Sequence, residues 1–305
     1  MGIGMRIGIN GTGQLSSLDG IIDAASRAEA DGFDSFWIAQ IFGVDALTAL
    51  ALTGRQVLRI ELGTAVVPTY PRHPMMLASQ ALTVQQATHD RLCLGIGLSH
   101  QIVVEHMWGY SWEKPVRHMR EYLDALLPLL RGEAADVHGE DITCVGAVDV
   151  GGVTHPPVLV AALGPQMLKV TGSRGCGTIT WCTGIRTLGD HIVPTITAAA
   201  EAAGHPAPRV ACGLPIAVTS DVDGTHALAA EQFALYGGLP SYAAMLEREG
   251  VTDPADVAII GDEAHVEAEL RRMADAGVTD FGAVITTTGR EDHDRTWALL
   301  KALRS

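Results

Sequence analysis

The segment LGTAVVPTYPRHPMMLASQ, residues 62–80, joins a strand pattern to a helix pattern and decides how the chain folds. After Leu62, its first residues are small or β-branched, which favours a buried strand. Pro68, Pro71 and Pro74 then stiffen the connection, and Pro74 stands at the first helical position, where its missing N–H costs nothing. A plain turn needs fewer residues and fewer prolines. The segment therefore indicates a strand–loop–helix unit with a crowded strand end.

The same unit recurs along the whole chain. Short apolar runs alternate with helical patterns, and several runs are continuous, as in strands buried on both faces. Eight strands, each followed by a helix, predict an α/β fold of the (β/α)8 TIM-barrel type, with a doubly wound sheet as the alternative. The expected strands are Met5–Asn10, Ser35–Ile38, Arg59–Val67, Arg91–Gly97, Pro157–Ala161, Gly177–Trp181, Arg209–Val218 and Asp280–Thr286.

Two stretches between the expected strands are too long for bare loops. Residues 131–155 follow the fourth strand and contain a hairpin-like pattern. Residues 219–277 follow the seventh strand and predict extra helices. No linker interrupts the chain, so we expect residues 1–305 to form a single domain, with insertions after strands 4 and 7.

Composition restricts the class of partner. The net charge of −14 disfavours nucleic acid and anionic membranes, which select basic surfaces. No apolar run reaches membrane-spanning length, and the N-terminus does not have the pattern of a signal peptide. The five cysteines are scattered, odd in number and form no C-x-x-C motif, which predicts reduced thiols in a cytoplasmic protein. A small-molecule substrate remains the expected partner.

In a barrel of this type, function lies at the carboxyl ends of the strands. The quoted segment contains one such end, and other ends carry polar or aromatic residues. A metal cluster is conceivable from His100 and His106, but their spacing matches no common helical ligand pair. We therefore expect no metal site.

Three stretches together resemble the bacterial-luciferase-like superfamily, and within it the coenzyme F420 (deazaflavin)-dependent oxidoreductases. They are LGTAVVPTYPRHP with its following helix, DRLCLGIGLSH at residues 90–100, and PVLVAALGPQMLKVTGSRGCGTITWCTG at residues 157–184. The resemblance covers roughly residues 5–184. It implies a TIM barrel that transfers a hydride to or from a deazaflavin.

The resemblance also implies how the cofactor is bound. In deazaflavin-dependent relatives the third strand ends in a bulge with a cis peptide bond, here between Ala65 and Val66, which backs the middle ring. A loop at a helix N-terminus takes the phosphodiester. An ordinary trans strand end and a tight βα turn remain the alternatives at these two places. The residues expected to bind the cofactor are Ala65, Val66, Gly97, Ser99, Leu163, Gly164, Pro165 and Gln166.

Departures from the relatives concern the chemistry. Ile41 stands where the dehydrogenases carry a catalytic histidine, and Ile185 where they carry a phosphate-binding lysine. These changes favour reduction of an activated C=C, C=N or C=O group over oxidation of a sugar phosphate. We expect His100 and Gln40 to be catalytic, with the proton supplied by His100 or by water. The expected substrate pocket consists of Asn10, Ile41, Phe42, Trp108, Trp181 and Thr183.

Two other functions stay open. An FMN-dependent luciferase-like monooxygenase would have the same fold and would activate oxygen. A barrel that binds a ligand without turnover is the third reading, supported by Gln40 and Ile41 in place of an acid and a base. The family commonly pairs, so a homodimer is expected.

Overall fold

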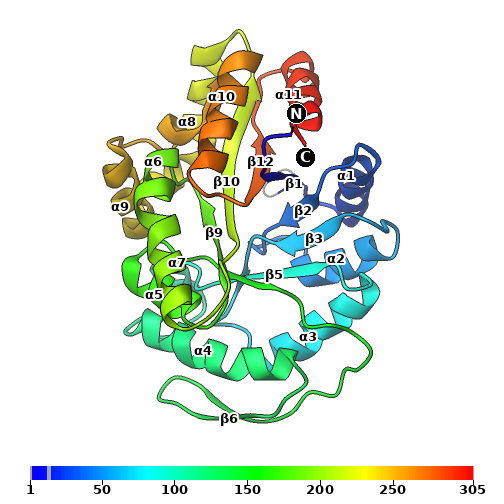
Figure 1. Ribbon diagram of the computed structural model, residues 1–305, viewed down its shortest axis with the longest axis vertical. Helices are drawn as coiled ribbons and strands as arrows, with labels where there is room; N and C mark the ends of the chain where they lie inside the picture. The colour runs from blue at the N-terminus through cyan, green and yellow to red at the C-terminus, as the bar shows by residue number, and fades with distance from the viewer. Residues whose placement is uncertain (1, 12–14, 305) are drawn as a thin grey trace. The chain divides into compact units, whose positions relative to one another are not determined.

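The barrel is closed by parallel pairing of its strands. The computed structural model describes residues 2–11 and 15–304. The strands pair in the order β11-β10-β12-β1-β2-β3-β5-β8-β9, with β9 also pairing β10 and β4 pairing β5. This is a closed eight-stranded parallel barrel with surrounding helices, and it confirms the predicted TIM barrel. Figure 1 traces the alternation of strands and helices along the chain.

The barrel strands lie where the apolar runs predict them, within two residues at each end. The exception is the expected run Arg59–Val67, which is divided into two strands, β3 and β4. The observed strands are β1 (Arg6–Asn10), β2 (Ser35–Ile38), β3 (Glu61–Thr64), β4 (Val67–Pro68), β5 (Leu92–Gly97), β8 (Val158–Val160), β9 (Gly177–Trp181), β10 (Val210–Val218) and β12 (Asp280–Ile285). All nine residues of β10 are buried, as its continuous apolar sequence requires.

The chain divides into two compact units. The first unit comprises residues 1–11, 28–36 and 162–305, and the second comprises residues 12–27 and 37–161. The helices of the second unit are α2 (Ala46–Gly54), α3 (Pro74–Ala87), the π-helix η1 (Val103–Met107) and α4 (Pro115–Leu130), while α1 (Leu18–Ala30) begins there and ends in the first unit. That the whole chain forms a single domain stays a prediction.

The helices of the first unit follow β8 to β12. They are α5 (Pro165–Gly172), α6 (Ile185–Thr187), the π-helix η2 (Leu188–Ile192), α7 (Val193–Ala202), α8 (Val222–Gly237), α9 (Pro240–Glu249), the 3₁₀ helix η3 (Pro254–Val257), α10 (Glu263–Asp275) and α11 (Arg290–Leu303).

Both predicted insertions are present. Between β5 and β8, β6 (Ala135–His138) and β7 (Thr143–Gly146) form an antiparallel hairpin. After β10, the chain forms α8, α9 and η3 before a short strand that the sequence did not predict, β11 (Ile259–Gly261), which pairs with the end of β10.

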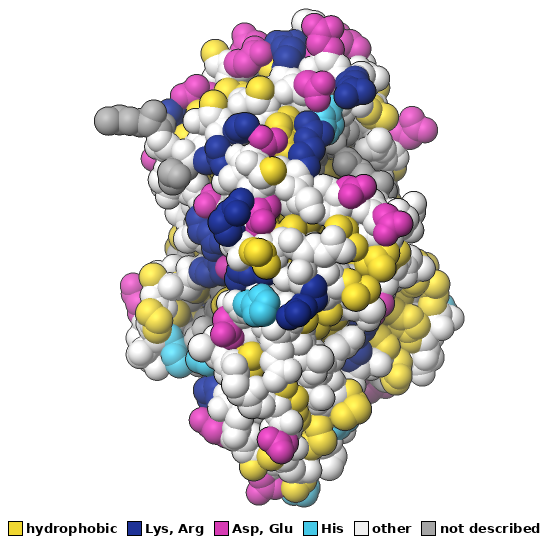
Figure 2. Space-filling view, turned by 90° about the vertical axis from the view of Figure 1, so that its right-hand side faces the viewer, with side chains coloured by type: hydrophobic (Ala, Val, Ile, Leu, Met, Phe, Trp, Pro, Cys, Tyr) yellow, Lys and Arg dark blue, Asp and Glu magenta, His cyan; other side chains and the backbone are white. Residues whose placement is uncertain are grey.

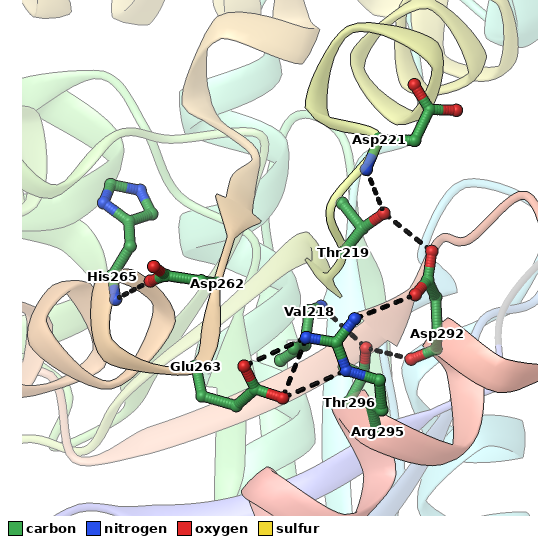
Figure 3. Close-up of polar contacts among 9 residues, drawn as sticks. All are labelled: Val218, Thr219, Asp221, Asp262, Glu263, His265, Asp292, Arg295 and Thr296. Carbon is green, nitrogen blue, oxygen red and sulfur yellow. Dashed lines mark hydrogen bonds and ion pairs between the residues drawn. The ribbon is translucent and has the colours of Figure 1, made fainter.

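A polar network in the first unit ties the second insertion to α11 (Figure 3). Thr219 Oγ1 donates to Asp292 at 2.6 Å and accepts the N–H of Asp221 at 2.9 Å. Arg295 binds Glu263 through two nitrogens, each at 3.0 Å, and contacts Asp292 at 3.3 Å. The first turns of α8, α10 and α11 are therefore held together by hydrogen bonds and ion pairs.

The surface is mixed in charge. On the face drawn in Figure 2, basic side chains are interspersed with acidic ones, and hydrophobic side chains gather in patches between them. Within the described ranges, no helix is both long and apolar enough to cross a bilayer. The five cysteines are buried thiols outside any disulfide.

Candidate active site

A β-bulge separates β3 from β4 in the second unit. Gly63 lies opposite Cys93, and Val67 lies opposite Ile96, so four steps along β3 and β4 match three steps along β5. One extra residue is thus inserted, as in a bulge. The peptide bond between residues 65 and 66, within this bulge, is cis. The bulge and the cis bond predicted for this strand end are both confirmed.

Backbone hydrogen bonds to the end of β2 hold the bulge. The N–H of Ala65 donates to the carbonyl of Ile38 at 2.8 Å, and the carbonyl of Val66 accepts the N–H of Gln40 at 3.0 Å. The side chain of Gln40 also has a structural partner, because its Oε1 accepts the N–H of Ala46 at 2.7 Å. Gln40 therefore joins the bulge to the start of α2. Its catalytic role stays a prediction.

Glycines on β5 leave the space that the bulge occupies. A Cβ on Gly95 would lie 1.9 Å from the carbonyl oxygen of Thr64. A Cβ on Gly97 would lie 2.7 Å from Cγ2 of Val66 and 3.1 Å from Cβ of Ala161. The hydroxyl of Thr64 completes the join, donating to the carbonyl of Gly95 at 2.7 Å and accepting its N–H at 2.9 Å. The sequence Gly-Ile-Gly is thus needed for close approach of the bulge to β5.

The chain turns sharply after β5. Ser99 has a positive φ of 66°, and the carbonyl of the next residue, His100, accepts the N–H groups of Val103 and Val104, each at 2.9 Å. These bonds form the turn that leads into η1, whose π-turn is closed by the N–H of Trp108 on the carbonyl of Val103 at 3.1 Å, and π-turns are frequent at functional sites. The His100 side chain is half-buried, and burial lowers its pKa below the ordinary value of 6.5. At neutral pH the ring is therefore mostly uncharged.

Apolar residues expected in the substrate pocket flank these two strand ends. Ile41 and Phe42 follow β2 and are 50% and 62% exposed. Trp108 follows η1 and is half-buried, and its N–H donates to the carbonyl of Val103 at 3.1 Å. Exposed apolar side chains beside a barrel strand end suit an apolar ligand. Their contact with a substrate stays a prediction.

An aromatic and polar cluster after β4 was not predicted from the sequence. The ring of Tyr70 stacks on that of His118, with centroids 4.0 Å apart, and also contacts Trp112 with centroids 5.6 Å apart. Nε2 of His118 lies 3.1 Å from the hydroxyl of Thr69, whose N–H donates to the carbonyl of Gly97. The cluster therefore fixes the loop that leaves the bulge.

Both titratable groups of this cluster are held in their neutral forms. Burial lowers the pKa of His118, although Asp141 and Glu121 act in the opposite direction. Burial raises the pKa of Tyr70 to about 12, with further contributions from the negative charges of Asp141 and Glu105. A signal was available in the sequence, since His118 stands within the apolar stripe of the helix.

The predicted phosphate loop lies in the first unit, between β8 and α5. Gly164 is the N-cap of α5, no side chain caps this helix, and Pro165 occupies its first position. Gln166 is exposed, Leu163 is half-buried, and a Cβ on Gly164 would meet nothing within 4 Å. A helix N-terminus that presents backbone N–H groups to open space is suited to bind a phosphate.

Two side chains from later elements hold the carbonyls that precede this helix. Nε2 of His191, on η2, lies 2.8 Å from the carbonyl oxygen of Leu163. The hydroxyl of Thr178, on β9, donates to the carbonyl of Ala162 at 3.3 Å. His191 was not among the predicted site residues, because nothing in its local sequence distinguishes it from other helical histidines.

The remaining pocket candidates lie at the ends of β1 and β9 in the first unit. Asn10 is buried, and a Cβ on Gly213 would approach both Cε3 of Trp181 at 3.1 Å and Nδ2 of Asn10 at 3.5 Å. Trp181 also packs edge-on against Phe233 of α8, with centroids 5.2 Å apart. Thr183 is fully buried, and its hydroxyl donates to the carbonyl of Trp181 at 3.1 Å. Asn10 and Trp181 thus meet at one glycine, whereas Thr183 closes a local turn.

The candidate residues therefore form two groups. Gln40, the bulge and the end of β5 with His100 lie together in the second unit, and the α5 loop and the Asn10–Trp181 pair lie in the first. Among the residues that the structure describes, no three His, Cys, Asp or Glu side chains gather as a metal site requires.

Comparison with known proteins finds similar sequences and a similar fold. The 5,10-methylenetetrahydromethanopterin reductase of Methanolobus tindarius is 30% identical over 260 residues, which cover 84% of this chain and 78% of that protein. The F420-dependent glucose-6-phosphate dehydrogenase of Mycolicibacterium gilvum is 27% identical over 298 residues, which cover 90% and 86%. The structure of the coenzyme F420-dependent tetrahydromethanopterin reductase from Methanopyrus kandleri has the same fold, with a TM-score of 0.82 and 21% identity over 98% of this chain and 97% of that one.

A match to a family profile extends over almost the entire sequence. Residues 3–297 match the family described as luciferase-like monooxygenase. The resemblance noted in the first 184 residues therefore extends through both insertions. This protein belongs to the luciferase-like monooxygenase family.

Proposed function

We propose that this chain is a coenzyme F420-dependent oxidoreductase that transfers a hydride between the deazaflavin and a small organic substrate. The observation that carries the proposal is the bulge between β3 and β4, which brings the half-exposed residues Ala65 and Val66 to a carboxyl strand end. Relatives named as F420-dependent enzymes support the choice of cofactor. The direction favoured is reduction of an activated C=C, C=N or C=O group, because Ile41 offers no base for oxidation of an alcohol.

The residues present fit a deazaflavin with a phosphodiester tail. Ala65, Val66 and Gly97 would lie behind the ring, and the uncapped N-terminus of α5 would hold the tail through backbone N–H groups. Coenzyme F420 supplies a carbon that accepts or donates a hydride. Gly164 has open space around it, so a phosphodiester can approach the backbone closely.

His100 is the chain's candidate for moving the proton. Its position directly after β5 places it beside Gly97 and Ser99, and its neutral ring can accept a proton or relay one from water. The exposed apolar side chains of Ile41 and Phe42 would bind the apolar part of a substrate and exclude water. The protein would thus act mainly by orientation.

Titration with cofactors tests the proposal. The purified protein is titrated with oxidised F420 and, separately, with FMN, and binding is followed by the quenching of cofactor fluorescence. We expect F420 to bind at micromolar or lower concentration and FMN at least tenfold more weakly. Tight binding of FMN without binding of F420 would overturn the proposal and favour an FMN-dependent monooxygenase, the activity after which the family is named.

A second assay separates an enzyme from a silent binder. Reduced F420 is mixed with a panel of activated alkenes, imines and ketones, and its reoxidation is followed in the absence of oxygen. Turnover with any acceptor supports the reductase. Binding of F420 without turnover of any acceptor would instead support a barrel that holds the ligand and does no chemistry.

We also propose a cytoplasmic homodimer. Five thiols outside any disulfide support a reducing compartment. Leu58, between α2 and β3, and Met76, on α3, are 63% and 61% exposed, and such apolar side chains suit a protein interface. Light scattering after gel filtration measures the mass directly. A mass of one chain at micromolar concentration would contradict the dimer, and Leu58→Glu should weaken it.

A further inference from the structure

His191 has a contact that its local sequence does not explain. It lies on the π-helix η2, is only 8% exposed, and directs Nε2 at the carbonyl oxygen of Leu163, 2.8 Å away. Because a carbonyl can only accept, Nε2 must carry the hydrogen. The contact is therefore a hydrogen bond from a buried imidazole to the peptide group that joins residues 163 and 164.

That peptide group leads into Gly164, the N-cap of α5. Among the described residues, the cis peptide bond lies at 65–66, so the 163–164 bond is trans. In a trans peptide the C=O and N–H groups point in opposite directions. Holding the carbonyl of Leu163 towards His191 therefore turns the N–H of Gly164 away from His191. A Cβ added at Gly164 would meet nothing within 4 Å, so an anion has room to approach the backbone beside this N–H.

A second side chain acts on the preceding carbonyl more weakly. The hydroxyl of Thr178 lies 3.3 Å from the carbonyl oxygen of Ala162, a longer bond than that of His191. A hydroxyl can rotate and change partner, whereas a packed imidazole has one direction. The orientation of the loop before α5 thus depends mainly on His191.

We propose that His191 is a positioning residue for cofactor binding, which aims the backbone N–H group of Gly164 towards the phosphodiester of a deazaflavin nucleotide. This inference rests on the proposed function. It assigns to η2 a role in affinity for the tail of the cofactor and none in the hydride transfer itself. The bond requires the tautomer of the imidazole that carries the hydrogen on Nε2.

The experiment compares two ligands on the full chain. Dissociation constants are measured by fluorescence quenching for F420 and for the deazaflavin riboside that lacks the phosphodiester tail. We expect His191→Leu to weaken binding of F420 about tenfold and binding of the riboside less than twofold. His191→Gln, whose amide can still donate to Leu163, should restore F420 affinity to within about threefold of the wild type.

A matched histidine on the same unit serves as the control. His226 lies on α8 and contacts Asp256 at 3.1 Å, so His226→Leu should leave both dissociation constants unchanged. If His191→Leu weakened the binding of both ligands equally, or did not weaken the binding of F420, the positioning role would be refuted. Should the wild-type protein bind the riboside but not F420, the proposed cofactor itself would be wrong and this inference would fall with it.

Melting temperatures show whether His191→Leu loses affinity only because the fold is less stable. His191 is buried, so the leucine variant is expected to melt at a lower temperature than the wild type. A general loosening of the fold would weaken the binding of both ligands, and His191→Gln would not restore it. The ratio of the two dissociation constants therefore reports the orientation of the loop.

Discussion

His100 carries a pKa that burial has lowered, and this decides the pH range in which it can donate a proton. A proton donor must be protonated, so reduction that depends on His100 should accelerate as pH falls below 6.5 towards the lowered pKa. In His100→Gln we expect kcat to fall about 100-fold and this pH dependence to disappear. Steady-state rates between pH 5 and 8, with F420 binding as the control, measure both. An unchanged profile in the variant would exclude His100 as the donor.

Gly97 sets the distance between β5 and the bulge. In Gly97→Ala the new methyl group would lie 2.7 Å from Val66, which must shift. We expect a loss of about 1–3 kcal/mol in the free energy of unfolding, together with weaker F420 binding. Gly43→Ala is the matched control, since its methyl group would meet nothing within 4 Å. Urea unfolding curves of the two variants measure the difference. Equal stabilities would show that Val66 shifts to admit the methyl group without loss of stability.

Some residue roles could be predicted from the sequence and others could not. The bulge at 65–66 could be predicted because a recognisable pattern surrounds it. Gln40 could not be placed, because only the fold shows that its side-chain oxygen accepts the N–H of Ala46. His191 was missed because a histidine inside a helical pattern looks like any other polar residue until its partner is known, whereas the position of His118 within an apolar stripe was a signal that was not used.

At the scale of elements, the β6–β7 hairpin is held by one buried carboxylate. Glu121 on α4 accepts the N–H groups of Glu140, Asp141 and Ile142 at 3.2, 2.8 and 3.0 Å. In Glu121→Gln the amide would bring an N–H₂ group towards these donors. We therefore expect a loss of about 1–3 kcal/mol in the free energy of unfolding.

The measurement for this element uses urea unfolding and limited proteolysis of the hairpin. Glu113→Gln, at an exposed position before α4, should behave as the wild type. Faster cleavage within residues 135–146 in Glu121→Gln alone would agree with the assignment. Equal cleavage rates in both variants would show that the hairpin is held by other contacts.

Element boundaries followed the apolar pattern where strands are long and continuous, as in β10. Two exceptions have physical reasons. The run Arg59–Val67 splits because the bulge interrupts pairing within an apolar sequence. The strand β11 has three residues, and its pairing depends on the extension of β10 beyond β12, which no local pattern reveals.

At the scale of the whole molecule, the burial of His118 makes stability depend on pH. Burial lowers the pKa of His118, so the unfolded state binds a proton first as pH falls. Its contribution to stability is complete above pH 6.5 and is lost as pH falls through the lowered pKa. We expect the melting temperature of the wild type to fall more steeply below pH 6.5 than that of His118→Gln. Parallel curves for the two proteins would contradict this assignment.

The fold of the whole chain could be predicted from the alternation of strands and helices, because each strand–helix pair buries its own apolar face. Which residues lie together at the strand ends could be predicted only in part. The rule that function lies at carboxyl strand ends selected stretches such as Gly97–His100, which lies beside the bulge. It could not show that Tyr70 and His118 stack there, since that contact joins residues far apart in sequence.

The π-helix η2 has a consequence for the history of the chain. It lies without a break between α6 and α7, and a π-turn contains about one residue more than an α-turn. Deleting one residue from Leu188–Ile192 would remove the π-turn, and His191 would rotate by about 100° around the helix axis. A one-residue insertion in an ancestral helix is thus sufficient to have recruited this imidazole. Homologues of different length at this point should carry a different donor to the loop before α5, or none.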